Sequence, residues 1–141
     1  MSSIVDSAIA YIQDLVLSSS DTIIKNAPDL PVDDASILPL AITHITGGTG
    51  TSEDASGAKL LLNVAVDVHF DRQSIKRTYQ LINAFIPEFL RRLAGDPGLG
   101  GTVSAIVFPV TVTVEPADWG SIVTHMVRFN LVLKFRETPL P

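Results

Sequence analysis

The sequence contains no cysteine among its 141 residues. This absence excludes disulfide bonds, thiolate nucleophiles and cysteine-ligated metal sites, and it is consistent with a reducing compartment. Aromatic residues are also sparse, at 6%, and Trp119 is the single tryptophan. Any function of this chain must therefore come from other side chains or from its surfaces.

Positive charge is scarce as well, because ten Lys and Arg residues stand against fifteen Asp and Glu residues, for a net charge of -5. This balance argues against nucleic-acid binding by bulk charge, which needs clustered basic residues. No apolar run reaches the roughly 18 residues of a membrane-spanning helix. The N-terminal segment carries Asp6 and Asp14 but no basic residue, unlike a signal peptide. We therefore expect no membrane partner and assembly in the cytoplasm.

The length of the chain and its 46% hydrophobic content fit one domain over residues 1–141. Two segments of this domain show helical periodicity. Apolar residues three and four apart predict a helix from about residue 3 to 18. A second helix is expected after Asp71, its N-cap, with a kink near Asn83 or a restart at Pro87. Its predicted apolar stripe comprises Ile75, Tyr79, Ile82, Ile86, Leu90 and Leu93.

Period-two alternation predicts strands over residues 37–45, 60–70, 106–114 and 123–135. Pro39 places the first of them at a sheet edge or begins it. Residues 115–120 are expected to link the last two strands as a hairpin. One face of the third strand is predicted to hold Ile106, Phe108, Val110, Val112 and Val114.

Small polar residues dominate the segment 46–58, TGGTGTSEDASGA, which we expect to be a flexible loop. In an assembly, this loop is a candidate contact region through Thr49, Glu53 and Asp54. The element order helix, strand, strand, helix, strand, strand then predicts an α+β fold of order αββαββ. The expected architecture is a two-layer sandwich, with two main helices on one face of a mainly antiparallel four-stranded sheet. The other sheet face is either solvated or covered by a neighbouring subunit.

A glycine-rich stretch, AGDPGLGGTVSAI, follows the second predicted helix from Ala94 to Ile106. A phosphate-binding loop requires the order strand, loop, helix, whereas the order here is helix, loop, strand. The Lys-Ser/Thr pair of a Walker motif is also missing. We therefore predict a tight turn in which Gly95 ends the helix in a left-handed conformation and Gly100-Gly101 leads into the sheet.

Residues Asp96–Val103, DPGLGGTV, follow a helix that ends in FLRRL. This pattern resembles the D-P-x-L-G-G-T-V turn of tail terminator and tail completion proteins of tailed bacteriophages. The leading helix, the Leu38-Pro39 pair, a strand ending in VHFDR and the long final hairpin also follow that family's order over most of the chain.

The resemblance implies a non-enzymatic virion protein of the tail or neck that forms a homo-oligomeric ring, usually of six subunits. Such a ring caps the tail tube and joins it to the head connector. The implied partners are copies of the same chain, the tail tube protein, the neck proteins and, as an open alternative, the sheath. DNA would only pass through the channel, and no cofactor is implied.

Candidate contact residues gather on the basic side of the second helix, where Arg72, Arg77, Arg91 and Arg92 face an acidic partner surface, passing DNA or only solvent. Trp119, at the tip of the last hairpin, is either an interface anchor or folds back onto its own domain.

Three histidines, His44, His69 and His125, fall on predicted strands without metal-ligand spacing, so we expect no metal site. Asp67 and His69 share a face and form the one candidate acid-base pair, but no nucleophile accompanies them. Two alternatives remain open. One is a head-completion or connector component of the neck, and the other is a small α+β ligand-binding module that would rely on this pair.

Overall fold

A computed structural model of the chain describes residues 4–19, 40–53, 57–70, 75–119 and 122–137. Within these residues the chain forms two helices, a short 3-10 turn and four strands. They are α1 (Ile4–Ser19), β1 (Leu40–Glu53), β2 (Gly57–Phe70), α2 (Ile75–Gly95), η2 (Leu99–Gly101), β3 (Ala105–Trp119) and β4 (Ile122–Glu137).

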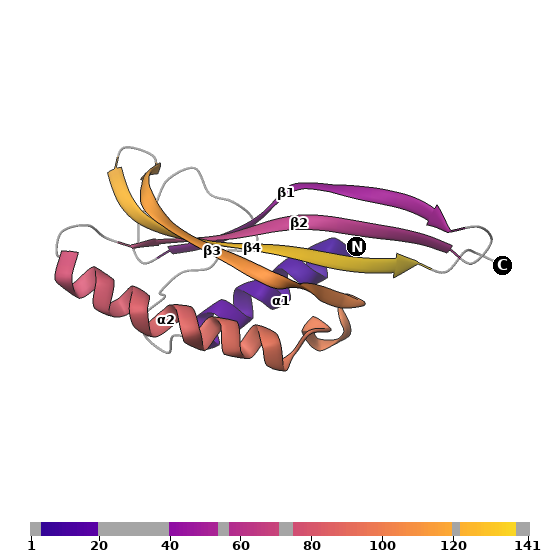
Figure 1. Ribbon diagram of the computed structural model, residues 1–141, viewed down its shortest axis with the longest axis horizontal. Helices are drawn as coiled ribbons and strands as arrows, with labels where there is room; N and C mark the ends of the chain where they lie inside the picture. Colours follow the sequence, from indigo (N-terminus) through magenta and orange to yellow (C-terminus); the bar gives the residue numbers. More distant parts are fainter. Residues whose placement is uncertain (1–3, 20–39, 54–56, 71–74, 120–121, 138–141) are drawn as a thin grey trace.

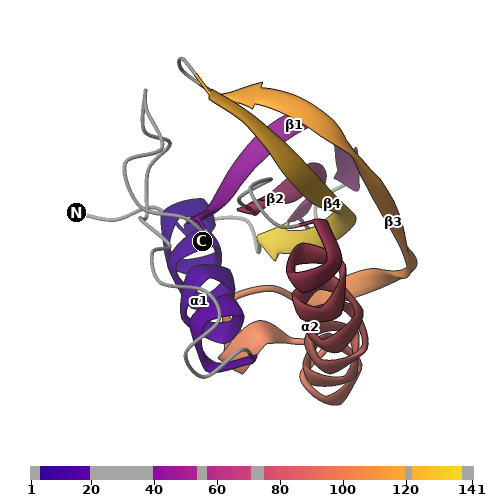
Figure 2. The same ribbon diagram turned by 90° about the vertical axis from the view of Figure 1, so that its left-hand side faces the viewer.

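The four strands form one antiparallel sheet in the order β1-β2-β4-β3, so that β2 and β4 are central and β1 and β3 are edges. Both helices lie along the same face of this sheet (Figure 1). Viewed end-on, α1 and α2 lie side by side beneath a strongly twisted sheet (Figure 2). The predicted α+β sandwich of order αββαββ is therefore confirmed.

The hydrophobic core fills the space between the helices and the central strands. Alternate residues of β2, among them Val64, Val66 and Val68, face the helices because side chains of a strand point alternately to its two faces. The centroid of the Phe129 ring on β4 lies 4.8 Å from that of Phe89 on α2, in an edge-to-face arrangement. Such aromatic pairs add to the burial of apolar surface, so this contact anchors α2 beneath β4.

A buried amide fastens α1 to the first strand. The Nε2 atom of Gln13 donates a hydrogen bond to the carbonyl oxygen of Ala41 over 3.2 Å. Its Oε1 atom accepts a hydrogen bond from the hydroxyl of Thr43. Because a buried amide without partners would be costly, this pairing orients α1 along β1.

The apolar stripe of α2 differs from the prediction. Phe85 and Phe89 are fully buried at its centre, whereas Tyr79 is 42% exposed. The helix also continues through Pro87, so the predicted restart there is wrong. Because Pro87 has no backbone N–H, the carbonyl of Asn83 has no donor within the helix. Both residues lie on the exposed side of α2, where water can donate a hydrogen bond to that carbonyl.

The predicted loop over residues 46–58 is wrong for residues 46–53 and 57–58. These residues extend β1 and β2 into a long hairpin that passes a β-bulge between Ile45 and Gly47. The strongly alternating residues of β2 provide a regular ladder, and backbone hydrogen bonds suffice to pair a partner with small side chains. Residues 54–56 lie outside the described part of the chain.

The second hairpin is also longer than predicted. Residues 115–119 belong to β3 and pair with the start of β4, so only residues 120–121 separate the two strands. A register shift between Val107 and Thr111 interrupts the alternation of β3. Phe108 lies within this shift and is 47% exposed, whereas Ile106, predicted on the same face, is buried.

The turn after α2 has its left-handed residues at Leu99, Gly100 and Gly101, with φ angles of 47°, 64° and 88°. Gly95 is the last residue of α2 and has no positive φ, so the prediction of a left-handed Gly95 is wrong. A Cβ atom on Gly100 would lie 2.5 Å from Cε2 of Tyr11. Glycine is therefore required at this position both by the backbone and by the packing of α1.

Candidate functional site

One carboxylate pairs with two of the four arginines of the predicted basic surface of α2. Glu88 Oε1 lies 2.7 Å from Nη2 of Arg91 and 2.9 Å from Nε of Arg92. Hydrogen bonds from these two arginines lower the pKa of Glu88 to about 2. Arg92 also donates to the hydroxyl of Ser18 over 3.3 Å, which ties α2 to α1. Arg77 is exposed.

The remaining predicted contact residues do not gather in one place. Thr49 is exposed on β1, and Glu53 ends that strand. Trp119 ends β3 at the opposite end of the sheet (Figure 1). Arg72 and Asp54 lie outside the described residues. Sequence reasoning therefore marked separate positions of one surface and not a single site.

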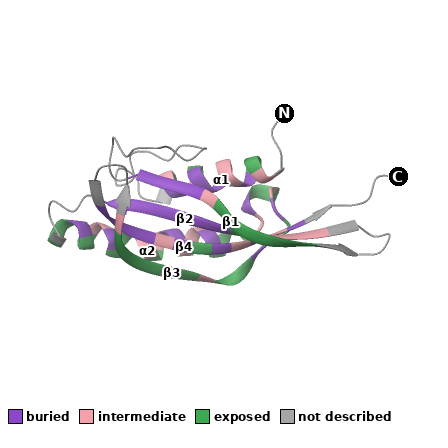
Figure 3. Cartoon of the chain, turned by 90° about the horizontal axis from the view of Figure 1, so that it is seen from above, coloured by how far each residue is buried: buried purple, intermediate pink, exposed green. Residues whose placement is uncertain are grey.

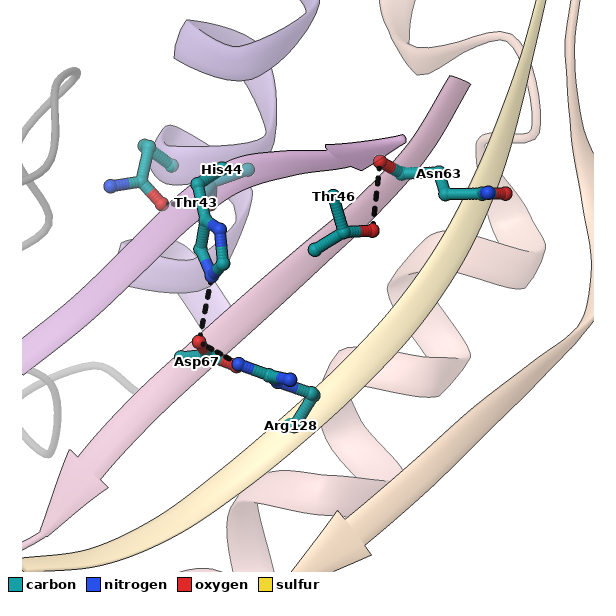
Figure 4. Close-up of polar contacts among 7 residues, drawn as sticks. Thr43, His44, Thr46, Asn63, Asp67 and Arg128 are labelled. Carbon is teal, nitrogen blue, oxygen red and sulfur yellow. Dashed lines mark hydrogen bonds and ion pairs between the residues drawn. The ribbon is translucent and has the colours of Figure 1, made fainter. Parts of the chain in front are cut away.

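An ion-paired row crosses the helix-free face of the sheet (Figure 4). Asp67 on β2 accepts hydrogen bonds from Nε and Nη2 of Arg128 on β4 at 2.6 and 2.8 Å. Nε2 of His44 on β1 lies 2.8 Å from the same carboxylate. Burial alone would raise the pKa of Asp67, but the hydrogen bonds from Arg128 and His44 outweigh it and lower the pKa. The row links three strands and leaves the carboxylate ionised.

Sequence reasoning missed this row because it paired Asp67 with His69. The carboxylate of Asp67 instead bonds Arg128, its direct cross-strand neighbour. The Nδ1 atom of His69 lies 2.8 Å from the hydroxyl of Thr124, and burial lowers the pKa of this histidine. One signal was available, since Asp67 and Arg128 both alternate onto the polar face of their strands.

The third histidine belongs to the helix-covered face. Nε2 of His125 lies 3.0 Å from the hydroxyl of Tyr79 on α2, while its Nδ1 atom is buried without a partner. His125 thus lies on the opposite face of the sheet from the other two histidines. Among the residues that the structure describes, no group of three or more His, Asp or Glu side chains could hold a metal ion. Each histidine binds a neighbouring side chain within its own part of the sheet.

The two edge strands present the most distinctive exposed surface of the described residues. We call residues 45–50 of β1 the β1 edge and residues 107–115 of β3 the β3 edge. The described residues expose five large hydrophobic side chains, and four lie on these edges: Ile45, Val107, Phe108 and Val114. Figure 3 shows the exposed residues running along β3 and the outer half of β1.

Neither edge strand contains a lysine or an arginine, although the chain has ten. Proteins commonly place lysine on exposed edge strands, because a charged side chain prevents another strand from pairing there. The central strands, by contrast, carry Lys59, Arg128, Lys134 and Arg136. Neither edge therefore carries a basic side chain against strand pairing, and on the β3 edge only Pro109 and the exposed Glu115 limit pairing locally. The two edges form the candidate assembly surface.

No protein-family model matches this chain, and no curated protein matches it in sequence. In the part of the chain that the structure describes, neither helix combines the length and the apolar character that crossing a membrane requires. The function is therefore inferred from the fold, the turn after α2 and the two sheet edges.

Proposed function

We propose that this chain is a structural subunit of a tailed-phage virion, of the tail-terminator type. Copies of the chain form a closed ring, which ends the tail tube and offers a surface to the connector or neck. In this proposal the protein acts by shape and contact and needs neither a cofactor nor a catalytic residue. Its place is the tail or neck of the particle.

The observation that carries the proposal is the construction of the Asp96–Val103 turn, on which the resemblance rests. The carboxylate of Asp96 accepts hydrogen bonds from the Tyr11 hydroxyl of α1 and from the backbone N–H of Gly100. These two bonds lower the pKa of Asp96. The side chain of Leu99 is buried in the core. The turn thus joins α1 to the end of α2.

The following residues join the same turn to the sheet. The backbone N–H of Ile106 donates to the carbonyl of Pro97 over 2.8 Å, and that of Ser104 donates to the carbonyl of Lys134 over 2.8 Å. Asp96, Leu99, Gly100 and Gly101 of the motif therefore each have a structural role in this fold. The turn holds the helical layer against the sheet. Its likeness to the tail-terminator turn therefore supports a fold shared with that family more strongly than a match of glycines alone.

The polar clusters of the described sheet add support. Asp67 is held by Arg128 and His44, and His69 bonds Thr124. These polar groups therefore use their hydrogen bonds within the protein and not for a bound substrate. General acid-base catalysis needs a group within hydrogen-bond reach of a substrate. A protein that acts through its surfaces accounts better for residues so engaged.

The mass of the native assembly tests the proposal. Native mass spectrometry of the purified chain should show a single closed assembly, with six subunits as the expected number. Negative-stain electron microscopy should show rings with a central opening. A subunit that stays monomeric at micromolar concentration in both measurements would contradict the proposal.

Partner choice separates a tail terminator from a component of the head side. The ring should bind purified tail tubes at their ends and should lower the yield of overlong tubes during polymerisation in vitro. The connector ring serves as the competing partner in the same assay. Binding to the connector without any effect on tube length would favour the head-completion alternative.

A further inference from the structure

The β3 edge offers a segment suited to pairing with another strand. An edge strand carries unpaired N–H and C=O groups along its outer side, which can bond a further strand. Pro109 and Pro116 lack an N–H and therefore bound the usable stretch. Between them lie six residues, of which Thr111, Thr113, Val114 and Glu115 are exposed. This stretch is long enough for an ordinary strand ladder.

Exposed apolar side chains flank both open edges. On the β3 edge, Val107 and Phe108 are 40% and 47% exposed, and on the β1 edge Ile45 is 46% exposed. A contact between the two edges that covers these side chains would be favourable in proportion to the apolar area removed from water. Each edge of the chain thus exposes at least one large apolar side chain.

The glycines of the β1 edge leave room for a neighbour. A Cβ atom on Gly47 would meet only Nδ2 of Asn63 at 3.8 Å, and one on Gly50 only Cδ1 of Leu60 at 3.7 Å. Neither glycine has a positive φ. Packing within the subunit therefore does not require glycine at either position. Glycine in a strand often marks a place where another backbone approaches closely.

Strand direction decides which contact can repeat. All neighbouring strands are antiparallel in the order β1-β2-β4-β3, so β1 and β3 of one chain run in opposite directions. A second copy in the same orientation therefore presents its β1 edge antiparallel to the β3 edge of the first. This contact uses two different surfaces, and such head-to-tail contacts generate rings when the rotation closes.

We infer that the β3 edge of each subunit pairs with the β1 edge of the next copy, so that the sheet continues from subunit to subunit. The inference rests on the proposed ring and specifies its interface. The occupant of each edge is a second copy of this chain. Phe108 and Val107 then lie against the glycine-rich outer part of β1.

Cross-linking through introduced cysteines tests this pairing, because the chain has no thiol of its own. Thr49→Cys places a thiol on the β1 edge, and Thr111→Cys places one on the β3 edge. Both positions are exposed, and their registers put them on the helix-free face. A short bismaleimide tolerates a register offset of a residue or two. The two single variants, their equal mixture and the double variant are compared.

The expected pattern is specific to head-to-tail pairing. The double variant should give a covalent ladder up to the full ring, the mixture should give covalent dimers, and neither single variant alone should cross-link. Dimers from the Thr111→Cys variant alone would indicate a two-fold β3-β3 contact and would overturn the inference. A ring in native mass spectrometry without any cross-link would overturn it while leaving the proposed function standing. A monomeric wild-type chain would contradict both.

A charge on the edge provides a second measurement. Val107→Lys places a lysine on the β3 edge and should reduce the native mass to that of one subunit with an unchanged circular dichroism spectrum. Asn83→Lys, which adds the same charge on the exposed side of α2, should keep the ring. Equal retention of the ring by both variants would contradict edge pairing.

Discussion

The central strands and the edge strands of this sheet contain the same residue types, but many of these residues are buried in the central strands and exposed on the edge strands. Every residue from Val64 to Phe70 on β2 is buried, whereas most residues from Val107 to Pro116 on β3 are exposed. Valine illustrates the contrast, because Val66 is inaccessible to water and Val114 is 41% exposed. Alternating apolar residues therefore specify a strand but not its position in the sheet.

The largest expected difference separates two phenylalanines. Phe129→Ala removes a fully buried ring that contacts Phe85 and Phe89, and it should lower the free energy of unfolding by about 3–5 kcal/mol. Phe108→Ala on the β3 edge should change it by no more than about 0.5 kcal/mol. Urea denaturation at a concentration where the subunit is monomeric measures both. Equal losses would show that the β3 edge belongs to the core.

The turn after α2 should behave like the centre of the molecule. Gly100→Ala combines a left-handed φ with a clash against Tyr11, and it should lower the free energy of unfolding by about 2–4 kcal/mol. Gly101→Ala meets no atom within 4 Å and should cost only the backbone strain, about 1–2 kcal/mol. The same denaturation experiment compares the two variants. An equal loss of unfolding free energy would show that the contact with Tyr11 does not add to the cost at Gly100.

Two glycines on β1 separate the needs of the subunit from those of the assembly. A Cβ atom on Gly48 would lie 2.5 Å from the carbonyl oxygen of Leu61, so Gly48→Val should destabilise the subunit by about 2 kcal/mol. Gly50→Val should leave the thermal midpoint of the monomer unchanged or raise it, because β-branched residues favour strands. It should nevertheless weaken the ring in native mass spectrometry. A ring of normal stability would show that the β1 edge is not an interface.

The ion-paired row of the helix-free face should respond to acid. The folded-state pKa of Asp67 is lowered, so its contribution to stability is present above the unfolded value of about 3.9 and is lost as the pH falls through the folded pKa. Asp67→Asn should lower the free energy of unfolding at pH 7 by about 1–3 kcal/mol. Urea denaturation at pH 7 and pH 3 should show a smaller acid-induced loss for the variant. An identical loss would mean that other carboxylates dominate.

The smallest effect is expected on the exposed side of α2. Arg91 forms an ion pair with Glu88 in solvent, and such pairs are screened and contribute little. Arg91→Ala should leave the thermal midpoint nearly unchanged, while Arg92→Ala should lower it slightly because Arg92 also bonds Ser18. A large effect of Arg91→Ala on ring mass alone would instead identify α2 as a contact surface.

Local patterns predicted much of the fold. The alternation of β2 and β4, the first helix and the element order are all confirmed, because each depends on periodicity within one segment. The weak alternation of residues 46–53 hid the second half of β1, which forms against the ladder of β2. The register shift that contains Phe108 likewise arises from pairing with β4. Such features depend on a partner strand that local patterns do not show.

The sequence by itself determined the two helices, the regularly alternating parts of the strands and the turn after α2, since backbone preference and side-chain spacing act over a few residues. Only the tertiary structure decided which strands lie at the edges and which polar residues meet. His44 and Arg128 lie 23 and 61 residues from Asp67 along the chain, and the antiparallel registers bring all three together. Contacts between distant residues depend on strand order and register, which no single segment encodes.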